Sequence, residues 1–183
     1  MSVLDSLDGA RVHDIIVPGY LDTGRGHPQF AQLGGAVYLE LELDRRFLLI
    51  DGSPAQGSLT LEIVDRIAAT RWLDDEDEEF ATAYIGGLFF DRGSAPRITR
   101  IRYAVNGESE LDRGVLRCAE FRLGSTTHLF FDPMTFERLQ LGVSGGYEDW
   151  QRESRDRERT IFGYTEEHVW EPATPPGERL SPR

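Results

Sequence analysis

The chain has 183 residues, enough for one domain with a sizeable core, and all twenty of its Lys+Arg residues are arginine. The absence of lysine excludes Schiff-base and pyridoxal chemistry, a phosphate-loop lysine and a Ser-Lys nucleophile pair. The formal net charge of -12 argues against nucleic-acid binding through a wide basic surface and against docking on anionic lipid. It favours a soluble cytoplasmic protein, or one with a basic partner.

Two further classes are disfavoured by the sequence. Cys118 is the single cysteine, so an internal disulfide is excluded and no secreted disulfide scaffold is expected. Residues 1–12 lack a long apolar stretch, so we expect no signal peptide. No apolar run approaches about 18 residues, so we expect no membrane-spanning helix.

The first half of the chain predicts three strands after a loop-rich segment. Residues 7–35 hold one short apolar run, which Pro18-Gly19 interrupts, and otherwise favour loops. Residues 36–43 then alternate apolar and polar side chains, as a half-buried strand does. Residues 47–50 form a continuous apolar strand, and residues 58–63 alternate again.

A similar series returns later in the chain, at residues 115–123, 128–132 and 139–143. We interpret residues 36–80 and 115–160 as halves of an internal duplication, each a three-strand unit followed by a polar stretch. The alternative is that two unrelated antiparallel meanders share alternation and turn residues.

Two strands in the middle of the chain have a predicted register. Residues 98–105 are expected to pair with residues 115–122. Placing Arg100 opposite Glu120 gathers the apolar side chains on the other face, and a one-residue slip would scramble both faces.

The predicted fold is therefore α+β and strand-rich, with a mainly antiparallel sheet and few short helices. The connections look too short for parallel crossovers. Residues 83–91 are also strand-like, and residues 1–164 are expected to form a single domain. Residues 165–183 contain four prolines and are predicted to be a disordered tail.

The sharpest motif is Gly142-Val143-Ser144-Gly145-Gly146, which fits G-x-S-x-G and follows a predicted strand. Over these five residues it resembles the nucleophile elbow of the α/β-hydrolase family. The resemblance implies Ser144 as a nucleophile and His168 as its base. That family has a mostly parallel sheet, whereas this chain predicts an antiparallel one, and the alternative is a glycine-rich turn.

The densest charge feature is an acidic run that follows Trp72. The run consists of Asp74, Asp75, Glu76, Asp77, Glu78 and Glu79. A calcium loop of EF-hand type is excluded because no glycine falls at its sixth position. A solvated loop, a partner-binding acidic patch with Trp72 and a weak divalent-cation site remain as alternatives.

A positive cluster lies on the predicted central strands, at Arg100, Arg102, Arg117 and Arg122. Arginine forks bind carboxylates and other anions, so one interpretation is an anion-binding site. The other interpretation is cross-strand pairing with acidic residues, as between Arg100 and Glu120.

Metal and thiol chemistry receive little support. The four histidines do not cluster at a metal-ligand spacing, so we predict neither a metal site nor a cofactor. Cys118 falls inside a predicted strand, where a free cysteine is commonly buried and inert.

The sequence leads us to a non-enzymatic cytoplasmic binding protein, of an acidic inhibitor or immunity type, that neutralises a basic protein partner. Trp72 and residues 74–79 are its predicted contact residues. A small serine hydrolase that uses Ser144 is the first alternative. A structural or oligomer-forming subunit is the second, since strand edges can pair between copies.

Overall fold

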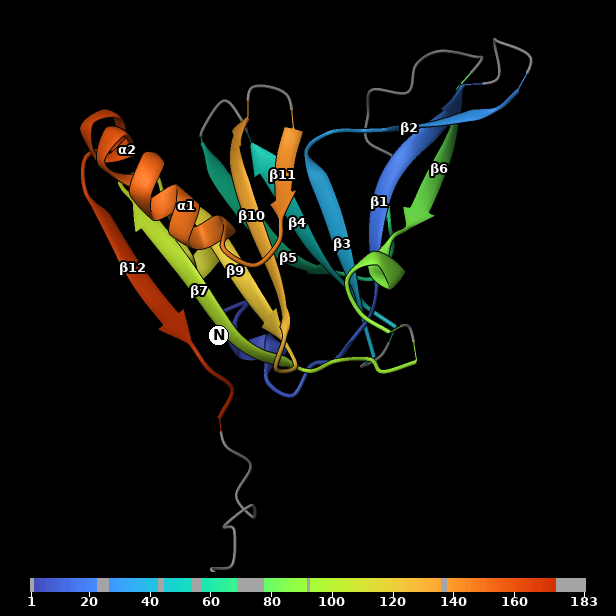
Figure 1. The fold of residues 1–183 in the computed structure, drawn as a ribbon, viewed down its shortest axis with the longest axis horizontal. Coiled ribbons are helices and arrows are strands. Elements are labelled where there is room, and N and C mark those ends of the chain that lie inside the picture. The colour runs from blue at the N-terminus through green and yellow to red at the C-terminus, as the bar shows by residue number, and fades with distance from the viewer. Residues whose placement is uncertain are drawn as a thin grey trace, which may run out of the picture.

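The structure, a computed structural model, describes residues 2–22, 27–42, 45–53, 57–68, 78–91, 93–135 and 138–173. Within these ranges the chain forms two antiparallel sheets and two short α-helices, which lie over one of the sheets (Figure 1). The predicted strand-rich, mainly antiparallel α+β fold is confirmed. None of the described helices is long and apolar enough to cross a bilayer.

The larger sheet has seven strands in the order β2-β1-β3-β4-β5-β8, and β6 pairs with β1. Its strands are β1 (Val12–Asp22), β2 (Gln29–Gln32), β3 (Ala36–Leu41), β4 (Phe47–Ser53), β5 (Ser58–Val64), β6 (Glu78–Tyr84) and β8 (Val115–Leu116). The three strands predicted over residues 36–63 are β3, β4 and β5, which form a consecutive meander.

The prediction of a loop-rich segment over residues 7–35 is wrong. Strand β1 is eleven residues long and continues through Pro18-Gly19. On one side β1 pairs with β3 up to Ile16 and with β2 from Gly19 onward. Pro18 falls between these two partners and still accepts a hydrogen bond from the backbone N–H of Leu33. A proline is tolerated there because no ladder partner needs its missing N–H.

The strand expected over residues 83–91 is displaced. β6 ends at Tyr84, and Gly86–Leu88 form a 3₁₀ turn, η2. The Asp14 carboxylate accepts the backbone N–H of Gly86 at 2.7 Å, which holds this turn against β1. A Cβ at position 86 would lie 2.5 Å from the Asp14 carboxylate oxygen, so the close approach depends on glycine.

The smaller sheet has the order β11-β10-β9-β7-β12. Its strands are β7 (Ile98–Asn106), β9 (Cys118–Leu123), β10 (Thr127–Thr135), β11 (Arg138–Gly142) and β12 (Thr165–Trp170). β9, β10 and β11 form a second consecutive meander, so both predicted three-strand units exist. Internal duplication as their origin stays a hypothesis.

The predicted disordered tail begins too early, because Thr165–Trp170 pair with β7 as the edge strand β12. Proline content suggested disorder, but the prolines come after this strand, at Pro172 and beyond. Residues 174–183 lie outside the described ranges.

The strand predicted over residues 115–123 is divided at Arg117. Val115 and Leu116 pair with β5 of the larger sheet, whereas the chain from Cys118 onward pairs with β7 of the smaller one. The predicted partner strands are correct, but the register differs by two residues. Arg102, not Arg100, lies opposite Glu120, and a bulge between Ile98 and Arg100 accompanies the shift.

The main core lies between the two sheets. Leu48 and Ile50 from the larger sheet belong to the same buried cluster as Phe121 and Phe131 from the smaller one. The two phenylalanine rings meet edge to face, with centroids 5.6 Å apart. Because both sheets contribute to one close-packed cluster, neither buries its apolar face alone.

The helices α1 (Gly146–Glu153) and α2 (Arg155–Phe162) lie over the outer face of the smaller sheet (Figure 1). Tyr147 and Trp150 are three residues apart on α1 and therefore share a face. Both side chains are buried in a second apolar cluster with Ala104, Cys118 and Phe130 of the sheet.

Candidate functional site

Two adjoining cavities lie where the N-terminal segment meets the end of β12. Their volumes are about 340 and 350 Å³, and they share Asp5 and Trp170, so we treat them as one acidic groove. The acidic groove is lined by Ser2, Leu4, Asp5, Asp8, Tyr103, Leu111, Asp112, Trp170, Glu171 and Ala173.

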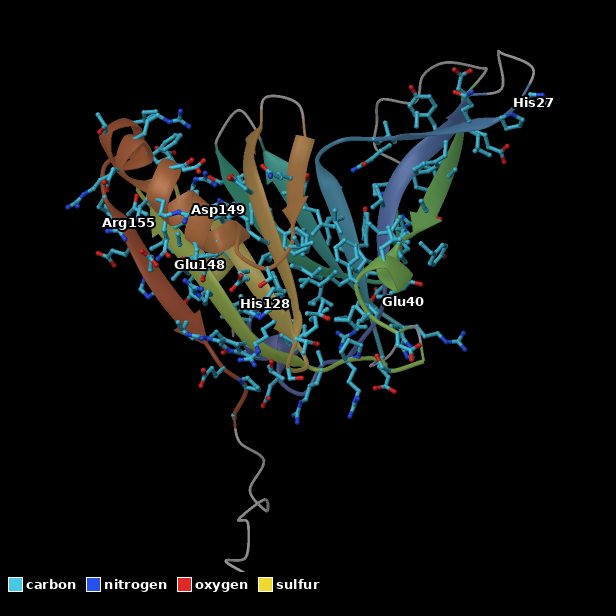
Figure 2. All side chains as sticks on the ribbon, viewed as in Figure 1. His27, Glu40, His128, Glu148, Asp149 and Arg155 are labelled. Carbon is cyan, nitrogen blue, oxygen red and sulfur yellow. The ribbon has the colours of Figure 1, made fainter. Side chains whose placement is uncertain are left out.

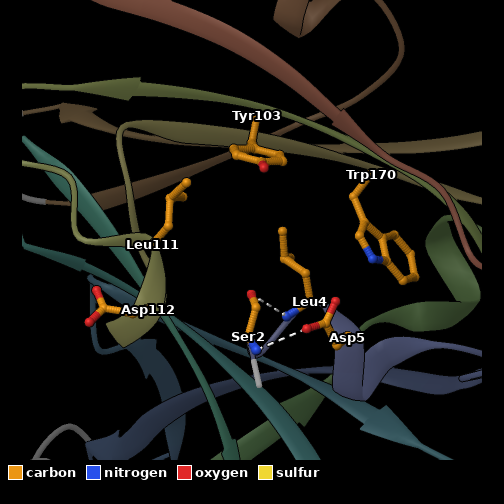
Figure 3. A pocket seen from close by; sticks show the side chains of 7 residues that line it. All are labelled: Ser2, Leu4, Asp5, Tyr103, Leu111, Asp112 and Trp170. Atoms are coloured by element: carbon orange, nitrogen blue, oxygen red, sulfur yellow. Dashed lines mark hydrogen bonds between the residues drawn. The ribbon is translucent and has the colours of Figure 1, made fainter.

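The cavity of about 340 Å³, which we call the Leu4 cavity, combines an apolar interior with an acidic rim. Figure 3 shows Leu4 between Leu111 and Trp170, with Tyr103 on one side of it and Asp5 on the other. The Tyr103 and Trp170 rings are partly buried, whereas the side chain of Asp5 is exposed. A ligand could thus contact aromatic surface while its polar end stays near carboxylates.

Local hydrogen bonds fix the N-terminal wall of the groove. The hydroxyl of Ser2 accepts the backbone N–H of Leu4 at 3.3 Å, and the Asp5 carboxylate accepts the backbone N–H of Ser2 at 3.0 Å. These bonds lead into the 3₁₀ turn η1 (Asp5–Leu7), which the fully buried Leu7 anchors in the core.

The opposite wall is the 3₁₀ turn η3 (Leu111–Arg113), which ends at Gly114. Gly114 has φ +74°, and a Cβ there would lie 2.3 Å from the carbonyl oxygen of Leu61. Only glycine fits this approach, so Gly114 fixes where Asp112 stands relative to the sheet.

The electrostatic character of the groove comes from four carboxylates: Asp5, Asp8, Asp112 and Glu171. None of the lining residues is an arginine or a histidine. Glu171 faces Arg100 at 3.8 Å, and both side chains are largely exposed. In the described part of the chain, no group of His, Cys, Asp or Glu is arranged to hold a metal ion. The groove therefore presents carboxylates and no cationic side chain among its lining residues.

The Tyr103 ring is supported from its own sheet. It stacks on the His168 imidazole with centroids 5.3 Å apart and planes inclined by 21°. Burial raises the pKa of Tyr103 above its ordinary value.

A set of charged and polar side chains that we call the ionic layer links the helical layer to the sheet: Arg117, Asp132, Trp150 and Glu158. The Arg117 guanidinium is fully buried and donates to both oxygens of the buried Glu158 carboxylate, at 2.6 Å from Nε. It also donates to Asp132 at 2.9 Å, while the Trp150 indole N–H donates to Glu158 at 3.0 Å. Burial lowers the pKa of Arg117, but these carboxylates outweigh it and leave the pKa raised.

A second arginine lies against an aromatic ring beside this layer. The Arg102 guanidinium carbon lies 4.2 Å from the centroid of the Tyr147 ring, and the guanidinium pairs with Glu148. The hydrogen bond from Arg102 lowers the pKa of Glu148. Glu120, almost fully buried, lies 3.6 Å from Arg102 and 3.4 Å from His128, which Figure 2 shows near Glu148.

The four arginines predicted as an anion-binding site are placed differently from one another. Arg117 is enclosed in the ionic layer, and Arg102 is paired with Glu120 and Glu148. Arg122 donates to the carbonyl of Ser125. Arg100 faces Glu171 at the rim of the acidic groove. Three of the four thus face carboxylates of the same chain.

Most of the acidic run lies outside the described residues, namely Asp74, Asp75, Glu76 and Asp77. Trp72, which precedes the run, lies outside them too. Glu78 and Glu79 begin β6, opposite Asp22 and Leu21 of β1, and the Glu79 side chain is exposed. Their role as partner contacts stays a prediction.

The structure does not bring Ser144 and His168 together. Ser144 is exposed in the turn between β11 and α1, so the predicted strand-to-helix turn exists. His168 belongs to β12, and β11 and β12 are the opposite edges of a five-stranded sheet. At about 4.8 Å per strand these edges are roughly 19 Å apart.

Cys118 is fully buried beneath the helices, as the sequence led us to expect. Burial raises the pKa of its thiol well above the ordinary value, and Asp132 and Glu158 act in the same direction. The neutral thiol is a poor nucleophile, so this cysteine is suited to packing.

Sequence reasoning missed most of the acidic groove. Trp170 was treated as a residue of a disordered tail, although His168 and Trp170 have the period of two typical of one strand face. Asp5 and Asp112 carry no such signal, because tertiary packing alone brings their two turns together.

Comparison of the chain with protein-family models, curated proteins and solved structures finds no match.

Proposed function

We propose that this protein is a non-enzymatic cytoplasmic binding protein that captures a basic protein partner, as an inhibitor or immunity-type protein would. The observation that carries the proposal is the acidic groove, in which two aromatic rings and four carboxylates line adjoining cavities without a cationic lining residue. Aromatic surface beside exposed charge is typical of the anchoring regions of protein interfaces.

Charge supports the same conclusion at longer range. The chain carries 32 acidic against 20 basic residues, so its field attracts a basic partner and speeds association. Several arginines are already engaged with carboxylates of the chain, whereas Asp5 and Asp112 at the rim of the groove show no ion pair among the described residues.

The test is capture of a partner by the immobilised protein from a lysate of the source organism, at low and high salt. The bound protein is identified, purified and titrated against the wild type and Asp5→Asn/Asp112→Asn. The variant should lower the association rate and the salt dependence, because two rim charges are lost. Equal binding by the wild type and the variant would remove the groove from the function.

Two control variants make the result specific. Glu62→Gln/Asp65→Asn removes the same charge from exposed positions that do not line the groove, and it should bind as the wild type does. Neutralising residues 74–79 tests the second predicted contact surface. If only this last variant binds weakly, the acidic run and not the groove captures the partner.

A further inference from the structure

Two arginines of the chain, Arg102 and Arg117, each lie against an aromatic ring and pair with a carboxylate. Arg102 lies 4.2 Å from the Tyr147 ring centroid and pairs with the exposed Glu148 carboxylate. Arg117 repeats the combination in a buried setting, 5.8 Å from the Trp150 ring centroid and bonded to Glu158. In both cases an aromatic ring and a carboxylate from the helical layer receive a guanidinium from the sheet.

The acidic groove has the same two components but no arginine among its lining residues. Tyr103 and Trp170 supply the rings, and Asp5 and Asp112 supply the carboxylates. We propose that the Leu4 cavity of the groove binds one arginine side chain of the basic partner, which contacts these rings and pairs with the rim carboxylates. This inference rests on the proposed function.

The dimensions of the cavity fit a single side chain. Its volume of about 340 Å³ lies at the lower end of the range found for small-ligand sites. Leu4 and Leu111 provide apolar contact for the methylene groups of an arginine, whose stem packs on such surfaces while its head stays near water.

The groove should prefer arginine to lysine. A guanidinium is planar and weakly hydrated, so it stacks on aromatic faces and can donate two parallel hydrogen bonds to a carboxylate. An ammonium group is compact and strongly hydrated, and it would have to lose more water on entering. Citrulline has nearly the shape of arginine without its charge and therefore isolates the electrostatic part.

The experiment is a titration of the full chain with three probes, acetyl-arginine amide, acetyl-lysine amide and acetyl-citrulline amide, followed by NMR. The indole N–H signal of Trp170 is identified by its loss in Trp170→Phe. Acetyl-arginine amide should shift this signal saturably and bind about tenfold more tightly than acetyl-citrulline amide. Asp5→Asn/Asp112→Asn should weaken arginine binding, whereas Glu62→Gln/Asp65→Asn should not.

The outcomes separate the two proposals. If the arginine probe gives no saturable shift, or one equal to that of citrulline, while the partner still depends on Asp5 and Asp112, the arginine site is wrong and the proposed function stands. If the partner binds the wild type and the rim variant equally, the groove function fails whatever the probes do. Equal binding of the lysine and arginine probes would mean that the cavity binds cations in general and does not prefer arginine.

Discussion

The ionic layer and the acidic groove lie on opposite faces of the smaller sheet and use the same kinds of side chain to different ends. Both combine a tryptophan, a tyrosine close by and several carboxylates. The ionic layer includes Arg117, and both members of its central ion pair, Arg117 and Glu158, are buried. No cationic residue lines the groove, and its carboxylates stand at an exposed rim, where Arg100 faces Glu171 alone among them.

The difference follows from the cost of burying charge. A carboxylate as deeply buried as Glu158 must have a partner within the chain, because an unpaired buried charge would destabilise the fold by several kcal/mol. A carboxylate at a rim, such as Asp112, is hydrated and can remain unpaired until a ligand arrives. The buried charges of the ionic layer are therefore paired within the chain, whereas Asp5 and Asp112 at the rim form no ion pair with the described residues.

The largest expected effect comes from breaking the ionic layer. Glu158→Ala leaves the Arg117 guanidinium buried with only Asp132 as a carboxylate partner, and we expect a loss of about 3–5 kcal/mol in the free energy of unfolding. Chemical denaturation measures it. Glu110→Ala removes the partner of the exposed Arg113 and serves as the control. If the two variants lose the same small amount, the buried pair is not what holds α2.

A smaller loss in the free energy of unfolding should appear only at alkaline pH. Burial raises the pKa of Tyr147, so above pH of about 10 the unfolded chain releases this proton while the folded chain retains it. Stability that is present below this pH is therefore lost as the pH rises, by about 1.4 kcal/mol per pH unit for this one group. Tyr147→Phe should remove that share of the slope in denaturation curves at pH 9, 10 and 11. Parallel curves for the two proteins would contradict it.

The rim of the groove should behave differently from the ionic layer. Asp5→Asn/Asp112→Asn should change the free energy of unfolding by no more than about 0.5 kcal/mol, since both side chains are exposed and an asparagine at position 5 can still accept the backbone N–H of Ser2. The same denaturation measurement applies. A loss comparable with that of Glu158→Ala would mean that the charges of the rim carboxylates themselves stabilise the fold.

The smallest expected effect is at Ser144. This residue is exposed in a turn, so Ser144→Ala should leave stability and partner capture unchanged. Hydrolysis of a simple aryl ester by the wild type, lost in the variant, would instead support the hydrolase alternative and contradict a purely binding function.

The meanders were predictable, whereas their surroundings were not. β3, β4 and β5 carry strong alternation or continuous apolar runs, and each was located from the sequence. β1 was missed because Pro18 normally ends a strand, and only the change of partner at that position makes it acceptable. The register of β7 on β9 was two residues out because a shift of two residues leaves every side chain on the same face, so alternation cannot detect it.

The groove was harder to predict than the fold for a related reason. Two 3₁₀ turns, η1 and η3, form its walls, and both are short segments without periodicity. Gly114 positions η3 through a close contact with Leu61, which is distant in the sequence. Periodic patterns report which face of an element is buried, but they do not report which loops meet at the end of a sandwich.

The division of one strand at Arg117 has a consequence for how the molecule comes apart. Its neighbours Leu116 and Cys118 belong to different sheets, while its side chain is bonded to α2. The helices, the smaller sheet and the larger sheet thus converge on one residue. Amide hydrogen exchange should consequently show β8, β9 and α2 opening together in a single cooperative unit, with no partly unfolded form in which the helices have detached first.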